Sequence, residues 1–259
     1  LLVHRDNEMR YQQPFGDRYV PLFAWGHTGH QMVADIAFHY LDEPTMEKVQ
    51  HYLGHMSPGE AGTWMDDMRS DHFYDYMKPW HYINVEKGEM YKPDPSARNI
   101  LIILNSAIHD LGDYKSMKDA KVKEDLCILF HLMGDLHQPL HVGYGIDKGG
   151  NSVLVNFVDK GYSNLHKVWD EEIIDYKHIS INDCLEREKS LTDDEKRLNN
   201  KLDILGWMNQ SRNHLDKVYD IKDSSIDKMY VDANTPVVED QLLCAGKRLA
   251  LVLKTIFEK

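Results

Sequence analysis

From residue 28 onward, apolar side chains recur three and four positions apart over long stretches of the chain. This spacing puts them on one face of an α-helix, which completes a turn in about 3.6 residues. Such a face has to be buried against other elements, so we predict an all-α fold. The helical stretches span residues 29–41, 45–53, 96–111, 122–137 and 237–257.

Residues 151–158 depart from this pattern. There Val153, Val155 and Phe157 alternate with their neighbours after a pair of glycines. A period of two that follows turn residues is typical of a β-strand. We therefore predict a small β-hairpin within the helical fold.

The chain of 259 residues contains no Gly/Ser/Pro-rich linker, so we predict a single domain over residues 25–259. Residues 1–24 differ, because they are rich in charges and lack a helical period. Their end, Val20-Pro-Leu-Phe-Ala24, is similar to the tail of a signal peptide, but no hydrophobic region precedes it. We interpret them as an N-terminal extension of uncertain origin, either a signal remnant or sequence added upstream. No run reaches the 18 or so apolar residues that span a bilayer, so no membrane segment is expected.

The formal net charge of −12 argues against a protein that holds nucleic acid on a broad basic surface. Any affinity for phosphate must come from a local site. The three cysteines, Cys127, Cys184 and Cys244, are too scattered for a disulfide framework or a thiolate zinc motif. The 15 histidines are far more than an ordinary share, which directs attention to their spacing.

The most informative motif runs from His131 to His141. A spacing of four places His131 and Asp135 one turn apart on a helix, where imidazole and carboxylate can converge on a cation. Pro139 should end this helix, because it lacks an amide donor and disfavours helical geometry at the preceding residue. His141 would then point in a new direction. His137 is expected to support the site by a hydrogen bond and not to bind metal.

A second pair with the same spacing is His166 and Asp170. Together with His141 they form a His/His/Asp set, the mixed ligands of a catalytic zinc that keeps a position open for water. The alternative is a surface pair worth about 0.3–0.5 kcal/mol of helix stability.

Weaker signals lie upstream. Asp66 and His81 each stand close to a tryptophan, in Trp64-Met-Asp66 and Trp80-His81. Trp25-Gly-His-Thr-Gly-His30 opens the first helical stretch, and its glycines allow the backbone to approach an ion closely. Read alone, Asp66 could be a surface carboxylate and the tryptophans core residues.

As a set, these motifs and Gly149-Gly-Asn151 resemble the zinc-dependent single-strand nucleases of the S1/P1 type, which carry three zinc ions. The resemblance implies a mainly helical fold shared with phospholipase C. It also implies a ligand set. One zinc is held by Asp66, His81, His131 and Asp135; the second by Asp135, His30 and the amino nitrogen and carbonyl oxygen of Trp25; the third by His141, His166 and Asp170.

The resemblance further implies an endonuclease that hydrolyses single-stranded DNA or RNA to 5′-phosphorylated products, with 3′-nucleotidase activity as an additional expectation. Asp66, Asp135 and His141 would be central to catalysis. Three zinc ions and three ligand carboxylates leave about +3 in one cleft, enough to attract a phosphodiester despite the acidic chain. Tyr82, Asn84 and Asn151 stand where the family holds a base. Asn84 stands where the fungal members have Asp, so their base preference is not expected to carry over.

Two alternatives stay open at the level of sequence. The first is a zinc phospholipase C-like phosphodiesterase, although that group has Glu where Asp170 stands. The second is a zinc-binding protein without catalytic activity. The expected partners are single-stranded nucleic acid and nucleotides, with no membrane and no obligate protein partner, and the expected location is secreted or periplasmic.

Overall fold

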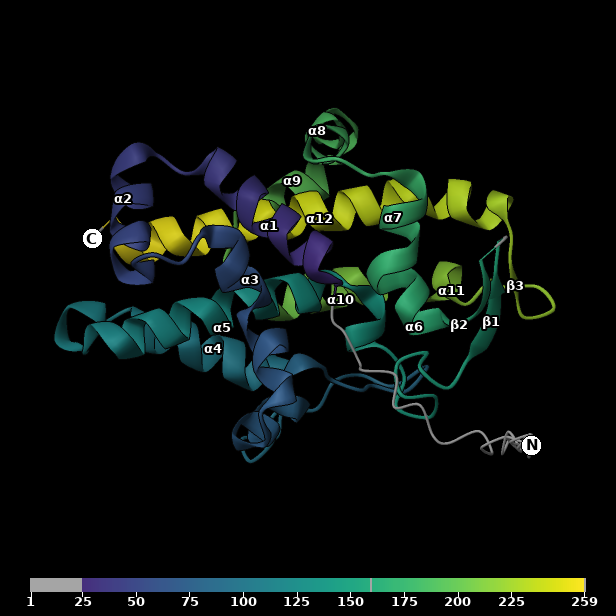
Figure 1. The fold of residues 1–259 in the computed structure, drawn as a ribbon, viewed down its shortest axis with the longest axis horizontal. Coiled ribbons are helices and arrows are strands. Elements are labelled where there is room, and N and C mark those ends of the chain that lie inside the picture. Colours follow the sequence, from purple (N-terminus) through teal and green to yellow (C-terminus); the bar gives the residue numbers. More distant parts are fainter. Residues whose placement is uncertain (1–24, 159, 259) are drawn as a thin grey trace, which may run out of the picture.

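The computed structural model of the protein describes residues 25–158 and 160–258. The N-terminal extension predicted for residues 1–24 lies outside them. The described part is mainly helical with a small sheet at one end (Figure 1). The predicted all-α class with a β-hairpin is therefore confirmed.

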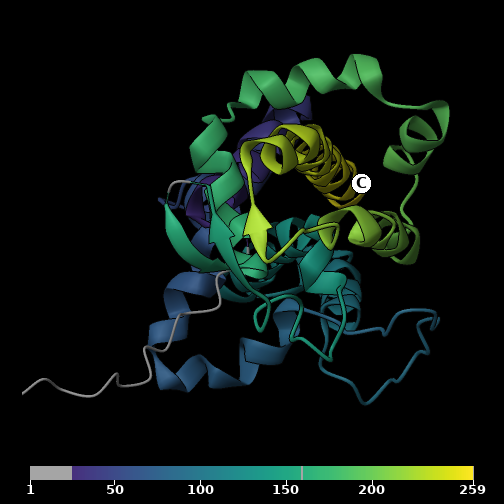
Figure 2. The same cartoon turned by 90° about the vertical axis from the view of Figure 1, so that its right-hand side faces the viewer.

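Helix α12 (Lys228–Phe257) is the longest helix in the described part and runs along the long axis of the molecule (Figure 1). It packs against α1 (His27–Tyr40) and α5 (Asp119–His137). Figure 2 shows it nearly end-on, with other helices around it. The start predicted for this helix, residue 237, is wrong. The helix begins nine residues earlier at Lys228, so Pro236 lies inside it, and the buried side chain of Val231 anchors the added turns.

The predicted helices at 29–41, 45–53, 96–111 and 122–137 correspond to α1, α2, α4 and α5. Helix α3 escapes the pattern because it is short and begins with Pro and Gly, yet a capping box of Ser57 and Glu60 fixes its start. The remaining elements between α1 and α12 connect these helices. In chain order they are α2 (Glu43–Leu53), α3 (Pro58–Asp67), η1 (Met68–Ser70), η2 (His72–His81), α4 (Ile100–Leu111), η3 (Tyr114–Ser116), η4 (Pro139–Val142), α6 (Leu165–Lys167), η5 (Val168–Glu172), α7 (Ile173–Lys177), α8 (Ile181–Glu186), η6 (Arg187–Ser190), α9 (Asp193–Asn199), α10 (Ile204–Arg212) and α11 (Leu215–Val218).

The sheet has the strand order β2-β1-β3. Strand β1 (Leu154–Phe157) pairs antiparallel with β2 (Gly161–Asn164), with Leu154 opposite Asn164, which confirms the predicted hairpin. Strand β3 (Ser225–Ile226) pairs parallel with β1. Two residues are too few to show a period, so the sequence did not predict β3.

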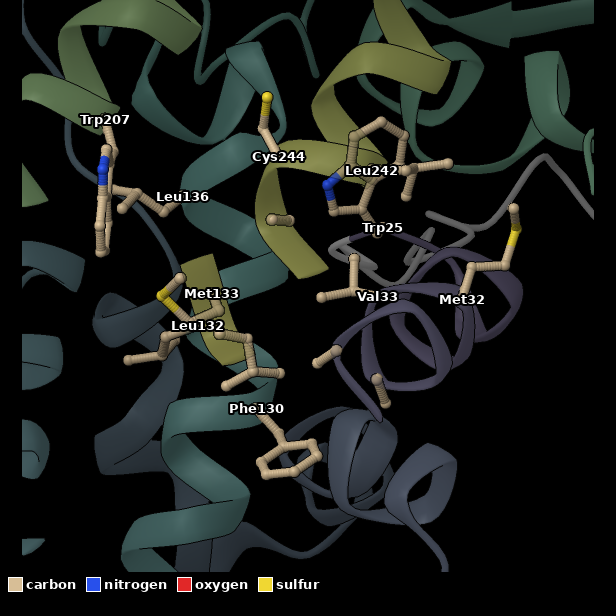
Figure 3. Close-up of a cluster of buried hydrophobic side chains, with 14 of the residues drawn as sticks. Trp25, Met32, Val33, Phe130, Leu132, Met133, Leu136, Trp207, Leu242 and Cys244 are labelled. Atoms are coloured by element: carbon tan, nitrogen blue, oxygen red, sulfur yellow. The ribbon is translucent and has the colours of Figure 1, made fainter. Parts of the chain in front are cut away.

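The core lies between α1, α5 and α12. Figure 3 shows Val33 of α1, Leu242 of α12 and Trp25 close together, with Phe130 and Met133 of α5 nearby. All residues of α5 from 125 to 137 are buried, as expected for a helix surrounded by protein. Polar side chains on this part of α5 must therefore find partners inside the protein.

The three cysteines are buried free thiols, so none of them is paired. In the part of the chain that the structure covers, no helix combines the length and apolar character needed to cross a membrane.

Candidate metal centre

The C-terminal end of helix α5 carries two residues of the types that bind metal ions. His131 and Asp135 lie on its last two turns and are fully buried. The helix ends at His137, and Pro139 opens the short 3₁₀ turn η4, which carries His141. The predicted helix break is thus present, and it brings His141 back toward Asp135, with 3.9 Å between His141 Nδ1 and Asp135 Oδ1.

Asp135 lies at the centre of the first cluster. Its Oδ1 is 3.3 Å from His30 Nε2, and its Oδ2 is 3.0 Å from His81 Nδ1 and 3.4 Å from His131 Nε2. Asp66 approaches the same group, with Oδ1 3.8 Å from His131 Nε2. Carboxylate oxygens directed to different imidazoles are the arrangement that lets one side chain bridge two cations.

The second cluster contains His141, His166 and Asp170. Asp170 lies one turn after His166, where α6 passes into the π-helical turn η5, a local form often found at functional sites. Its Oδ2 is 3.2 Å from His166 Nε2, and its Oδ1 is 3.7 Å from His141 Nε2. The two predicted pairs are therefore neighbours in space.

Among the described residues, three groups of side chains could each hold a metal ion. Within each group, the ligand atoms all lie within 4.8 Å of one another. The resemblance predicted His30 in a different set from Asp66 and His131, whereas here these three form one group. The groups are His30, Asp66 and His131; His81, His131 and Asp135; and His141, His166 and Asp170.

Backbone carbonyls fix the outer nitrogen of several of these imidazoles. The Nδ1 of His131 contacts the carbonyl of Gly62 at 2.7 Å, and that of His141 contacts the carbonyl of His81 at 2.7 Å. His166 Nδ1 contacts the carbonyl of Gly149 at 2.6 Å. An Nδ1–H that donates to a carbonyl leaves Nε2 with a lone pair for a metal.

The fit to a metal rests on polar atoms that have no hydrogen-bond partner. A buried polar atom without a partner costs about 1–3 kcal/mol, so such atoms are rare in proteins. Here several lie together, and divalent cations would satisfy them while matching the N/O ligand preference of zinc. They include His30 Nε2, Asp66 Oδ2, His81 Nε2, Asp135 Oδ1 and His141 Nε2.

The charges of the two clusters are coupled. Burial alone would raise the pKa of Asp135, but the imidazoles of His131 and His141 hold it well below its usual range. Burial alone would lower the pKa of His141, but Asp135 and Asp170 raise it to about 9. Burial outweighs Asp135 at His81 and lowers its pKa to about 4. The centre thus keeps the Asp135 carboxylate ionised, as a metal ligand must be.

A cleft of about 460 Å³ opens beside the clusters, and His81, His141 and His166 form part of its wall. The predicted substrate residues Tyr82, Asn84 and Asn151 all line it. Tyr82 and Asn84 face outward from an extended segment in which the alternate residues are buried.

The same cleft is lined by Arg69, Lys78 and Lys148, which the sequence reasoning missed. Arg69 donates to Asp66 Oδ1 at 3.0 Å. Its position three residues after Asp66 was an available signal. Lys78 lies three residues before His81 in η2, and Lys148 directly precedes Gly149-Gly-Asn151, so their spacing was an available signal as well.

Gln138 and Arg212 are two further residues that hold the walls of the site. Gln138 donates to Asp170 Oδ1 at 2.5 Å and so joins the end of α5 to the second cluster. Arg212 of α10 donates to the carbonyls of Val85 at 2.6 Å and Gly143 at 3.2 Å, one on each of the two segments that line the cleft.

His137 does not support the cluster, so that expectation is wrong. Its Nδ1 contacts the carbonyl of Met133 at 2.7 Å, and its Nε2 accepts from Arg248 of α12 at 2.7 Å. Both nitrogens are therefore engaged away from the ligands. His137 is two residues after Asp135, and side chains two residues apart point to different sides of a helix.

Trp25 is fully buried at the start of the described chain, and the amide of Gly26 donates to the carbonyl of Asp170 at 2.9 Å. A Cβ placed on Gly134 would lie 3.5 Å from Trp25 Cδ1. The backbone of Trp25 thus begins next to the residues that carry the clusters.

Comparison with known proteins relates this arrangement to one family. The family model described as S1/P1 Nuclease matches residues 25–258. Endonuclease 2 of Arabidopsis thaliana is 31% identical over 181 residues, which is 64% of this chain but only 61% of that protein, so the match spans less than two thirds of it. Endonuclease 1 of the same plant is 25% identical over 90% of this chain and 87% of its own. Nuclease S1 of Aspergillus oryzae is 28% identical over 90% of this chain and 92% of its own.

Proposed function

The chain belongs to the S1/P1 nuclease family, and from this we propose that it is a three-zinc endonuclease of single-stranded DNA and RNA. Membership makes it a hydrolytic nuclease and favours this function over the phospholipase C-like alternative. The observation that supports the proposal most strongly is the group of buried, unpartnered His and Asp atoms beside the cleft. A zinc-binding protein without activity would have no need of an open cleft at that place.

We assign the ligands as the family resemblance implies. Asp135 would bridge two ions, because its oxygens face His30 on one side and His81 with His131 on the other. Trp25 would complete the coordination of the ion near His30. The three sets are Asp66, His81, His131 and Asp135; Trp25, His30 and Asp135; and His141, His166 and Asp170.

Zinc, when bound, supplies a Lewis acid for phosphate oxygens and an activated water, so no separate protein base is needed. The residues of the chain orient the ions and the substrate around them. Gln138 holds Asp170 in place by a hydrogen bond, and Asp66 is held by Arg69. The Arg69 guanidinium also lines the cleft, where it can bind a phosphate oxygen as charge develops on it. Departure of the 3′-oxygen leaves the phosphate on the 5′ side.

The preference for single strands follows from where the positive charge lies. The net charge of −12 gives little electrostatic grip on a duplex, whereas Arg69, Lys78 and Lys148 line one cleft. An unpaired strand can turn its bases into that cleft and stack them on an aromatic ring. Tyr82, 42% exposed on the cleft wall, is the ring that we assign to this role, with Asn84 and Asn151 contacting the base edge.

The test uses purified protein with measured zinc content. We expect three zinc ions per chain, rapid cleavage of heat-denatured DNA and RNA, and slow cleavage of duplex DNA. The products should carry a 5′-phosphate that a phosphatase removes. A 3′-mononucleotide tests the additional nucleotidase activity. Hydrolysis of phosphatidylcholine without hydrolysis of denatured DNA would reject the proposal.

The proposed location, secreted or periplasmic, depends on Trp25. If Trp25 must begin the chain to bind metal, the bond after Ala24 has to be cut, as happens when a leader is removed during export. N-terminal sequencing of the natural protein, recovered separately from the medium, periplasm and cell interior, tests this. A cytosolic protein that begins upstream of Trp25 would contradict it.

A further inference from the structure

The segment that joins Asp66 to His81 presents aromatic rings to solvent beside the cleft. It consists of η1 and the ten-residue 3₁₀ helix η2, seen as a blue coil near the lower edge of the molecule in Figures 1 and 2. Runs of 3₁₀ helix longer than three or four residues are uncommon. Within η2, Phe73 is 74% exposed and Tyr76 is 48% exposed.

The 3₁₀ period of three residues sorts η2 into three faces. Met77, flanked by Tyr74 and Trp80, is on the face turned toward the protein. Phe73 and Tyr76 are on a second face, which is open to solvent. His72, Asp75 and Lys78 form a charged third face, joined by contacts of 3.3 Å and 2.6 Å to the Asp75 carboxylate.

The rings of this segment form a continuous series that leads to the metal centre. Phe73 contacts Tyr74 with ring centroids 5.2 Å apart, Tyr74 lies 6.4 Å from Tyr76, and Tyr76 lies 5.2 Å from Trp80. Trp80 precedes the ligand-type residue His81. At the same end Lys78 lines the cleft. The exposed ring of Tyr76 is therefore two residues from Lys78, on the same short helix that reaches the cleft.

We propose that the exposed face of η2, Phe73 and Tyr76, is a second binding surface for the single strand, on which bases outside the cleft stack. A rise of about 2 Å per residue places rings three residues apart roughly 6 Å from each other, a separation at which each can take a base of an extended strand. Aromatic faces next to a cation are the chemistry that binds single strands without sequence preference. The Lys78 ammonium would contact the backbone phosphate between the cleft and this surface.

The inference rests on the proposed nuclease function, so the test compares a long and a short substrate. In the double variant Phe73→Ala/Tyr76→Ala we expect KM for an oligonucleotide of about 20 residues to rise by on the order of tenfold or more, with kcat nearly unchanged. Cleavage of a dinucleotide, which cannot reach η2, should keep its KM and kcat. Phe73→Trp should retain tight binding of the long substrate. Met229→Ala, at a residue 79% exposed on α12, is the matched control.

Charge and stacking can be separated by salt. Lys78→Met should reduce the slope of log affinity against log salt by about 0.7, the value of one phosphate contact on a single strand. The Phe73→Ala/Tyr76→Ala variant should weaken binding with the slope unchanged.

Binding of a phosphorothioate oligonucleotide, measured by fluorescence anisotropy, tests the surface even if the wild-type protein cuts no nucleic acid and the proposed function fails. Equal affinity of wild type and double variant for that oligonucleotide would overturn the inference. An equal loss of activity of the double variant on the dinucleotide and on the long oligonucleotide would also overturn it. So would a double variant that loses binding to phosphatidylcholine vesicles but keeps its affinity for the oligonucleotide.

Discussion

The imidazole of His30 lies against Gly134 of α5, in the space that a Cβ atom at position 134 would need. Gly134 directly precedes Asp135. A Cβ on Gly134 would lie 2.6 Å from His30 Nδ1 and 2.8 Å from His30 Cε1, closer than atoms can pack. Glycine at this position is therefore what allows a ligand from α1 to reach a ligand on α5.

From this contact we expect Gly134→Ala to impair the metal centre without removing any ligand. The added methyl group must displace His30, and overpacking of a core costs about 1–3 kcal/mol. We predict loss of the ion nearest His30 and a fall in activity of about 10- to 100-fold, the usual effect of disturbing ligand support. Zinc content by mass spectrometry and turnover on denatured DNA measure this. Gly59→Ala is the control, because its methyl group would meet only the flexible side chain of Gln31; equal zinc content in both variants would contradict the prediction.

Asp135→Ala removes the carboxylate that faces imidazoles on two sides. Two cations without the bridging charge would repel each other, so we predict loss of two ions, at least about a 100-fold loss of activity and a lower melting temperature of the zinc-loaded protein. Glu124→Ala changes a partly exposed carboxylate on the same helix and should have none of these effects. Near-normal turnover with full zinc content in Asp135→Ala would remove the assigned role of this residue.

Tyr82→Ala should weaken binding of single strands by roughly 1–3 kcal/mol, the value of one stacked base, while hydrolysis of a small phosphodiester changes little. Tyr82→Phe keeps the ring and should behave as wild type. Affinities for an oligonucleotide and turnover on bis(p-nitrophenyl) phosphate give the comparison. Equal loss on both substrates would instead mean that Tyr82 supports its neighbour His81.

Metal binding should depend on pH through His141. Burial would lower its pKa, but Asp135 and Asp170 raise it to about 9, so below that pH the metal-free imidazole carries a proton. A metal must displace that proton, and zinc affinity should therefore rise from pH 7 toward 9 and fall as the pH drops. The pKa of His81 is lowered to about 4, so its ring is already neutral at pH 7 and contributes no proton. Competition with a chelator, in wild type and His141→Gln, measures the slope; an affinity that is constant over this range in wild type would reject the prediction.

The parts of the fold and site that depend on local spacing could be predicted from the sequence. His131 with Asp135, and His166 with Asp170, are neighbours because one helical turn separates them, and Pro139 ends the helix for reasons internal to its own residue. The hairpin strand at 154–157 followed from a period of two. These features need no knowledge of the rest of the chain.

The parts that depend on distant segments could not be predicted in this way. Arg212 reaches Val85 across 127 positions of sequence, and no local pattern marks that contact. His137 lies within the ligand motif, yet its ring turns to Arg248, which is 111 residues away. The resemblance supplied the grouping of ligands, and the structure places His30 with Asp66 and His131 as well as beside Asp135.

The peptide bond between Ala24 and Trp25 should weaken the binding of one zinc ion. The family resemblance gives an amino nitrogen of this residue to the ion near His30, and a free amine is required for that bond. In the chain of 259 residues Trp25 follows Ala24, so its nitrogen is an amide whose lone pair is delocalised into the peptide bond and binds zinc poorly. Trp25 is nonetheless held in the protein interior beside the clusters, with the Gly26 amide 2.9 Å from the Asp170 carbonyl. We therefore expect the full chain to bind the ion near Trp25 weakly while the other two sites fill, and a chain that begins at Trp25 to hold three ions and cut faster. Zinc titration and turnover of the two forms decide this, because three ions of equal affinity and equal rates in both would show that the amine is not a ligand.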